Sequence, residues 1–410
     1  MATPNLRPPV DLIDQSQYEA AGPPHATFAQ LRRECPVYWN EMPGDVGFWS
    51  LLKYKDIFDV SLDQKTFSSA KRGVILRPFK EDEYEVQKGL LVNMDPPRHT
   101  KHRRLVSLGF SGKVIRNLEY HVREITNDII DQVAPLGECD FVDRISAELP
   151  LQVIVEMVGV PKEDRRKVLE WSNKMIGFDD PEYGLDPTVG AMAAAELFMY
   201  ANELAEDRLA NPKDDLVSTL MHAEVDGERL DRADFSSFFM LLLVAGNETT
   251  RNLVSGGMLA LIEHPEQRAR LMADRSLLPT AVEEMLRWVS PVNVFRRTAL
   301  RDTEVHGQKV REGEQVVLFY ASANRDEDAF PHAETFDIGR TPNDHLAFGI
   351  GPHFCLGANL ARLEIRVMFE ELLRRLPDIE LAGPAERLRS YFINGIKRMP
   401  VRFTPSRAGA

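Results

Sequence analysis

Apolar residues recur three and four positions apart along most of the chain between residues 111 and 220. This is the spacing of one face of an α-helix. Gly137, the Gly159-Val160-Pro161 turn, Gly177 and Asn211-Pro212 interrupt the pattern where helices would end. The pattern therefore predicts a mainly helical fold, with helices over residues 117–133, 150–158, 162–175, 188–209 and 214–222.

A longer helix is predicted over residues 232–263, and its centre changes character abruptly. Residues 241–245 are apolar all round, which indicates a helix that passes through the core. Gly246 then precedes four polar residues, among them Glu248 and Thr249. A buried carboxylate and hydroxyl are costly unless they are bonded or used. Either this is a simple kink, with Ala245 and Gly246 leaving room beside the helix, or Glu248 and Thr249 are functional.

The β-structure is a minor part of the prediction. Alternating or bounded apolar runs predict short strands around residues 36–39, 47–51 and 315–319, and residues 290–297 leave a helix and turn into a strand. Asn324 follows the strand at 315–319 and is expected to end it. No period persists from residue 73 to 93, which indicates either a surface loop or a loop that folds over a pocket.

The segment from Phe348 to Gly357 reads Phe-Gly-Ile-Gly-Pro-His-Phe-Cys-Leu-Gly. Its glycines allow backbone angles that are closed to other residues. A helix is predicted over residues 358–373, so Cys355 lies at a helix N-terminus, where the dipole favours a thiolate that could bind iron. A buried, inert cysteine is the alternative. A dinucleotide-binding loop is excluded, because Phe354 occupies the third glycine position.

Composition narrows the class of protein. The net charge of −13 over 410 residues argues against nucleic acid or an anionic membrane as the main partner. Three cysteines are too few for a disulfide framework, which fits a reducing compartment. No signal peptide and no apolar run near 20 residues is seen, so a cytoplasmic protein without a membrane anchor is expected. We expect one domain over residues 1–410, with residues 1–35 as an N-terminal extension.

The segment from Phe348 to Gly357 resembles the haem-thiolate loop of the cytochrome P-450 family, and four further motifs follow the family order between about Pro36 and Val401. The resemblance implies the cytochrome P-450 fold, which is mainly α with a minor β portion, and haem b with Cys355 as the iron ligand. The haem-binding residues that it implies are His99, Arg103, Ala245, Arg297, Phe348, His353, Cys355 and Gly357. Taken alone, His99 and Arg103 are one turn apart on a helix and could be a solvated basic turn.

The Ala-Gly-x-Glu-Thr segment is similar to the oxygen-binding groove of the family. This similarity implies that Thr249 acts beside the iron and that Glu248, where many members have Asp, relays protons. Glu284, Arg287 and Arg340 resemble the family's buried Glu-Arg-Arg lock, although an isolated Glu-Arg pair one turn apart is worth little. The substrate-pocket residues implied by the resemblance are Val74, Leu91, Phe178, Leu242, Val244, Ala245, Val292, Val294, Phe295 and Ile393.

The implied activity is that of a monooxygenase that inserts one oxygen atom from O2 into a C–H bond of a hydrophobic substrate. The motifs are most similar to the branch acting on steroid side chains, methyl-branched lipids and terpenoids. Electrons would come from a ferredoxin and its reductase, because no flavin or dinucleotide domain is seen. The candidate docking residues are Lys101, Arg104, Arg362 and Arg366. The alternatives are a peroxide-driven haem peroxygenase and a non-catalytic haem-thiolate sensor or electron carrier.

Overall fold

The computed structural model describes residues 10–42, 44–77, 84, 87–176, 182 and 187–407. The helices of the first half are α1 (Gln15–Ala21), α2 (His25–Glu34), α3 (Tyr54–Leu62), α5 (Arg98–Val106), α6 (Gly112–Asn117), α7 (Glu119–Val133), α8 (Glu148–Val158), α9 (Lys162–Ile176) and α10 (Pro187–Ala210). Those of the second half are α11 (Leu216–His222), α12 (Arg232–Glu263), α13 (Pro265–Ala273), α14 (Leu278–Val289), α15 (Tyr320–Ala323) and α16 (Ala358–Arg375).

The strands are short. They are β1 (Val37–Asn40), β2 (Phe48–Leu51), β3 (Phe67–Ser68), β4 (Glu138–Asp140), β5 (Val294–Ala299), β6 (Thr303–Val305), β7 (Gln308–Val310), β8 (Gln315–Phe319), β9 (Glu380–Leu381), β10 (Glu386–Arg387), β11 (Ile396–Arg398) and β12 (Pro400–Arg402). Single turns of 3-10 helix lie at Leu91–Asn93, Ser107–Phe110, Arg275–Leu277 and Gly351–His353, and a π-helical turn lies at Val142–Ser146.

The helices predicted from the periodicity are confirmed, each within two residues of its predicted ends, and α12 has the predicted bounds. The pattern missed β4 and the π-helical turn between α7 and α8. The reason is non-local: β4 pairs with β12, which comes from the end of the chain, with Cys139 opposite Val401. A three-residue strand whose partner lies so far away leaves no local period.

The predicted strands form the largest sheet, which has the order β1-β2-β8-β5-β3. β2 and β8 are parallel, and the other neighbours are antiparallel. β8 is buried on both faces, because Val316 and Leu318 pack into one apolar cluster while Val317 and Phe319 pack into another. The expectation that Asn324 ends this strand was wrong, since α15 intervenes between β8 and Asn324.

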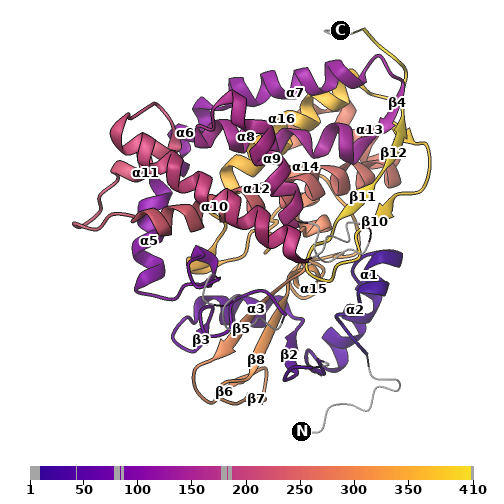
Figure 1. Ribbon diagram of the computed structural model, residues 1–410. Coiled ribbons are helices and arrows are strands. Elements are labelled where there is room, and N and C mark those ends of the chain that lie inside the picture. Colours follow the sequence, from indigo (N-terminus) through magenta and orange to yellow (C-terminus); the bar gives the residue numbers. More distant parts are fainter. Residues whose placement is uncertain are drawn as a thin grey trace.

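The long helix α12 runs through the middle of the helical part of the molecule, with the five-stranded sheet on one side of that part (Figure 1). α12 packs against α8, α10, α14 and α16. Its start is fixed by Asp231, whose side chain accepts a hydrogen bond from the amide of Asp234. Within the described ranges no helix is both long and apolar enough to span a membrane.

Candidate functional site

The Cys355 loop has the tight backbone that its glycines allow. Gly349 and Gly351 have φ of +67° and +73°, which only glycine adopts readily. A Cβ on Gly351 would also lie 2.9 Å from Leu62 Cδ2. The amide of Cys355 donates a 2.9 Å hydrogen bond to the carbonyl oxygen of Phe348, which closes the loop.

Gly357 differs from the other two glycines and corrects the prediction that all three need unusual backbone angles. Its φ is −84°, which any residue can adopt. A Cβ built on Gly357 would meet nothing within 4 Å. The space beside the start of α16 is therefore open, and a flat group could approach the backbone closely there.

The surroundings of Cys355 act on its thiol in opposite directions. Burial raises the pKa of the thiol, although a backbone hydrogen bond from Gly357 and the charges of Arg103 and Arg362 act to lower it. A coordinated metal ion deprotonates a thiol directly.

Four basic side chains from three separate segments of the chain face a common region near this loop, and they are His99, Arg103, Arg297 and His353. The rings of His99 and His353 are 4.1 Å apart, and Ser69 Oγ lies 3.2 Å from His353 Nε2. His99 is 2 % exposed, and its Nε2 has no hydrogen-bond partner among the described residues. Burial, with nearby arginines, lowers the pKa of His353 to about 2 and that of His99 to about 4.

The two arginines of this group are Arg103 and Arg297, and both lack an anionic partner among the described residues. Arg297 is buried and donates to the carbonyl oxygen of Arg296 at 2.8 Å, and burial lowers its pKa. Burial also lowers the pKa of half-buried Arg103. Neither arginine forms an ion pair with a carboxylate of the described residues. Buried cationic donors without an acid are costly, so the set fits a ligand that brings its own carboxylates, as haem does with its two propionates.

The middle of α12 faces open space on one side. Ala245 is exposed, and Leu241, Leu242, Val244 and Thr249 are half-buried, although the helix passes through the core. Thr249 Oγ1 donates a 2.7 Å hydrogen bond to the carbonyl oxygen of Ala245. These residues form an apolar helix face with one hydroxyl beside the accessible Ala245.

Gly246 does not leave room beside α12, contrary to the prediction. A Cβ on Gly246 would lie only 2.1 Å from Ile154 Cδ1 of α8. A larger residue here would force the Ile154 side chain of α8 to move, because α8 packs directly against the helix at this point. The open side of α12 is the one that carries Ala245.

Glu248 is 4 % exposed and is held by its own helix. Its Oε1 accepts a 2.9 Å hydrogen bond from Asn252 Nδ2 and forms a hydrogen-bonded ion pair with Arg251. Its Oε2 has no partner among the described residues. Arg251 and Asn252 were missed in the sequence, although their spacing of three and four from Glu248 is the one that allows contact on a helix.

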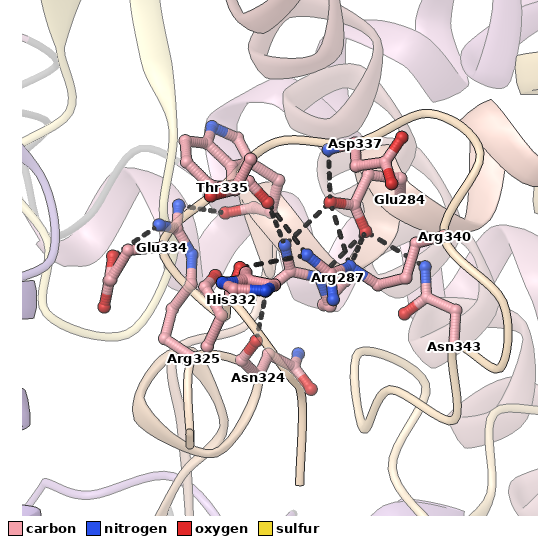
Figure 2. Close-up of polar contacts among 12 residues, drawn as sticks. Glu284, Arg287, Asn324, Arg325, His332, Glu334, Thr335, Asp337, Arg340 and Asn343 are labelled. Atoms are coloured by element: carbon pink, nitrogen blue, oxygen red, sulfur yellow. Dashed lines mark hydrogen bonds and ion pairs between the residues drawn. The ribbon is translucent and has the colours of Figure 1, made fainter. Parts of the chain in front are cut away.

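The structure brings Glu284, Arg287 and Arg340 together in a buried network (Figure 2). Arg287 donates to both oxygens of Glu284 at 2.7 and 2.8 Å, and Arg340 Nε lies 3.1 Å from Oε2. Both arginines also donate hydrogen bonds to backbone carbonyl oxygens of residues 331–335. Asn343 Nδ2 donates a 3.1 Å hydrogen bond to Glu284 Oε2. The network ties α14 to the segment that leads into the Cys355 loop.

The predicted pocket residues divide into several groups. Val292 pairs with Ile393 in an isolated bridge, and the rings of Phe295 and Phe392 are 5.8 Å apart, so these two segments lie together. Leu91 and Val74 are buried.

The place of Val294 in the pocket stays a prediction. Val294 is fully buried in the apolar cluster with Phe28 and Phe48, because alternation along β5 directs it away from Phe295. Phe178, which was also predicted to line the pocket, lies outside the described residues.

The four candidate docking residues all have acidic partners, so their positive charge is partly neutralised. The pairs are Lys101–Glu228 at 2.5 Å, Arg104–Asp226 at 2.6 Å, Arg362–Glu283 at 2.7 Å and Arg366–Glu119 at 2.9 Å. A sequence shows the cations but not the acids that reach them from other elements.

Comparison with known proteins identifies the relatives of the chain. A sequence model of the cytochrome P-450 family matches residues 191–377. The chain is 43 % identical to a steroid C26-monooxygenase of Rhodococcus jostii (strain RHA1), over all of this chain and 88 % of the relative. It is 46 % identical to a methyl-branched lipid omega-hydroxylase of Mycobacterium tuberculosis (strain ATCC 25618 / H37Rv), over 92 % of this chain and 90 % of the relative.

Solved structures agree with these relatives. A Mycobacterium marinum cytochrome P-450 in complex with pseudoionone is 42 % identical and has a TM-score of 0.86, with 95 % of each chain covered. A Bacillus megaterium enzyme in complex with corticosterone is 33 % identical, with a TM-score of 0.84 over 93 % of this chain and 98 % of that one.

Proposed function

The chain belongs to the cytochrome P-450 family and is a monooxygenase, and from this premise we propose that it hydroxylates the branched side chain of a steroid or another methyl-branched lipid. The observation that carries this proposal is the apolar, accessible face of α12 beside Thr249, in a chain whose relatives are named for steroid and branched-lipid hydroxylation. A terpenoid substrate is the second candidate, favoured by the solved relative that holds pseudoionone.

In this proposal the four basic residues His99, Arg103, Arg297 and His353 bind the propionates of haem b, and Cys355 supplies the thiolate ligand. Haem ligated by a thiolate supplies the chemistry of O–O cleavage, because the sulfur donates electron density to iron. The open space beside Gly357 and Ala245 supports this assignment. The apolar face of α12 would exclude water and orient the substrate.

Glu248 and Thr249 are proposed to deliver protons. Thr249 holds its hydroxyl on the accessible face of α12 through the bond to the Ala245 carbonyl oxygen. The unpartnered Oε2 of Glu248 is the oxygen free to take and give a proton, while Oε1 stays bonded to Asn252 and Arg251. A sensor or electron carrier has no use for a buried acid beside a hydroxyl, and peroxide-driven members lack this pair, so neither alternative is favoured.

The substrate class can be tested by spectral titration of the haem-loaded protein. We expect a steroid with an intact branched side chain, or a methyl-branched fatty acid, to displace the water on iron at low concentration. The same steroid nucleus without its side chain is the matched control and should bind weakly. Turnover with a ferredoxin system should place the new hydroxyl on the branched chain. Preferred binding of the side-chain-free steroid, or hydroxylation of its rings, would refute the proposal.

We expect Thr249→Ala to bind haem and substrate as the wild type does but to waste most of the electrons it consumes as hydrogen peroxide. The substitution removes the hydroxyl while leaving the backbone hydrogen bonds of α12 intact. Thr250→Ala is the matched control, because Thr250 is buried and neighbours the accessible face without belonging to it. The measurement is product formed per reductant consumed. Unchanged coupling in Thr249→Ala would contradict the role of this hydroxyl.

The ferredoxin is proposed to dock on α6 and the start of α16. Lys113 and Arg116 of α6 are exposed and form no ion pair with any described residue, unlike the four cations first considered. Leu108 and Val114 are exposed apolar neighbours, at 47 % and 37 %. A cavity of about 380 Å³ between α6, α14 and α16 includes Arg116 and residues of the first turns after Cys355.

Reversing both free charges, as Lys113→Glu with Arg116→Glu, should slow reduction by an acidic ferredoxin at least about tenfold at low salt, because steering depends on local positive charge. The effect should shrink as salt is added. Lys101→Glu with Arg104→Glu is the matched control, and its effect should be smaller because these cations are already paired. If the two double variants slow reduction equally, or neither does, docking on α6 is wrong.

A further inference from the structure

A second carboxylate of α14, next to the one in the Glu284 network, makes a separate set of contacts. Glu283 accepts two hydrogen bonds from Arg362 of α16, Nε to Oε1 at 2.7 Å and Nη2 to Oε2 at 2.8 Å. This bidentate geometry is the stronger form of an arginine–carboxylate ion pair. The two residues are 79 positions apart in the chain, so the pair fastens the helix after Cys355 to α14.

Both partners of this ion pair make further contacts with residues in or just before the Cys355 loop. The guanidinium carbon of Arg362 lies 4.6 Å from the centre of the Phe348 ring, within the range of a cation–π contact. His345 Nε2 lies 3.2 Å from Glu283 Oε2, and the His345 side chain is 2 % exposed. The rings of His345 and Phe348 are 6.1 Å apart. Glu283, Arg362, Phe348 and His345 thus form a closed ring of contacts, called here the Glu283 brace.

The brace ends on the backbone group that holds Cys355. Phe348 supplies the carbonyl oxygen that accepts the 2.9 Å hydrogen bond from the Cys355 amide. The Glu284 network reaches the same segment by a different route, because Arg287 donates to the carbonyl oxygen of Asn324 and Asn324 Oδ1 accepts a 2.7 Å hydrogen bond from the Leu346 amide. The brace is therefore a second support of the loop, and the family resemblance did not point to Glu283 or His345.

The carboxylate of Glu283 stays ionised near neutral pH. Burial raises the pKa of Glu283, but the bonds from Arg362 and His345 outweigh it and lower the pKa to about 2. The positive charge of Arg362 in turn opposes the effect of burial on Cys355. Arg362 is thus a paired member of the loop support rather than a free cation.

We propose that Glu283, Arg362 and His345 are positioning residues for Cys355, which hold Phe348 and, through its carbonyl oxygen, the cysteine in the orientation needed to ligate haem iron. This inference rests on the proposed haem-thiolate function. Its consequence is specific: weakening the brace releases the cysteine ligand before it unfolds the protein.

The test follows the ligand and the fold separately. Haem-loaded Arg362→Lys and Glu283→Gln are held in mild urea, and two rates are measured: loss of the thiolate-type absorption of the reduced carbon monoxide complex, and loss of helical circular dichroism. Lysine keeps the charge of Arg362 but not its bidentate geometry. We expect both variants to lose the thiolate absorption about fivefold faster than wild type or more, while the helical signal changes little.

Arg366→Gln is the matched control, because Arg366 lies one turn further along α16 and pairs with Glu119 at 2.9 Å without a described contact to the loop. It should retain the absorption as the wild type does. His345→Gln is a milder variant that tests the brace if the ion-pair variants do not fold, and it should show the same order of loss. Retention within about twofold of wild type in these variants, or parallel loss of absorption and helix, would overturn the proposal. A wild-type protein without thiolate absorption would instead overturn the proposed function.

Discussion

Replacement of Cys355 by serine is expected to abolish the thiolate absorption of the reduced carbon monoxide complex and, with it, hydroxylation. Serine is close in size to cysteine, so the 2.9 Å hydrogen bond from residue 355 to Phe348 should persist and the loop should fold. A hydroxyl does not become an anionic ligand as a thiol does, because its pKa is far higher. The expected result is a folded protein that binds haem weakly and without sulfur ligation.

The other two cysteines provide controls for this experiment. Cys139 lies in β4 opposite Val401 of β12, and Cys35 follows the end of α2, so neither belongs to the loop from Phe348 to Gly357. Cys35→Ser and Cys139→Ser should therefore keep the spectrum of the wild type. A thiolate-type spectrum in Cys355→Ser, or a histidine-type spectrum in the wild-type protein, would refute the assignment of the ligand.

Local patterns in the sequence were sufficient to predict most helices and the contacts between residues of one helix. The period of three and four located α7 to α12 because each buries one face, or all of its surface, against neighbours. The pairing of Glu284 with Arg287 is a spacing of three on one helix, and the structure shows it. The place of Arg340 in the same network could be expected only from the family resemblance, since nothing local connects it to α14.

Contacts between distant segments could not be predicted, and they account for several of the corrections. The tight approach of Ile154 to Gly246 depends on how α8 crosses α12, which no periodicity reveals. The acidic partners of Arg362 and Arg366 come from α14 and α7, so two cations that look free in the sequence are paired in the fold. The direction of Val294 depends on the register of β5, and a shift of one residue would reverse it.

Glu284→Gln is expected to have the largest effect on stability. Glu284 and Arg287 are fully buried, and the carboxylate is the only described acid that meets Arg287 and Arg340 together. Removing its charge leaves a buried guanidinium without a counter-charge, which lowers the free energy of unfolding by roughly 3–5 kcal/mol. We expect a large fall in the midpoint of thermal unfolding, and poor haem content because the segment before the Cys355 loop loses its attachment to α14.

The exposed pair between Arg270 and Asp337 gives a control in the same region. These side chains are 2.9 Å apart but 48 % and 41 % exposed, so Arg270→Gln should cost no more than about 1 kcal/mol. Thermal unfolding followed by circular dichroism and haem absorption per mole of purified protein measure both variants. Each substitution removes one charge within reach of the 331–343 segment, but Glu284 is buried with two arginine partners and Arg270 is exposed with one acidic partner. If Glu284→Gln keeps the wild-type midpoint and haem content, or matches Arg270→Gln, the buried network does not hold the loop.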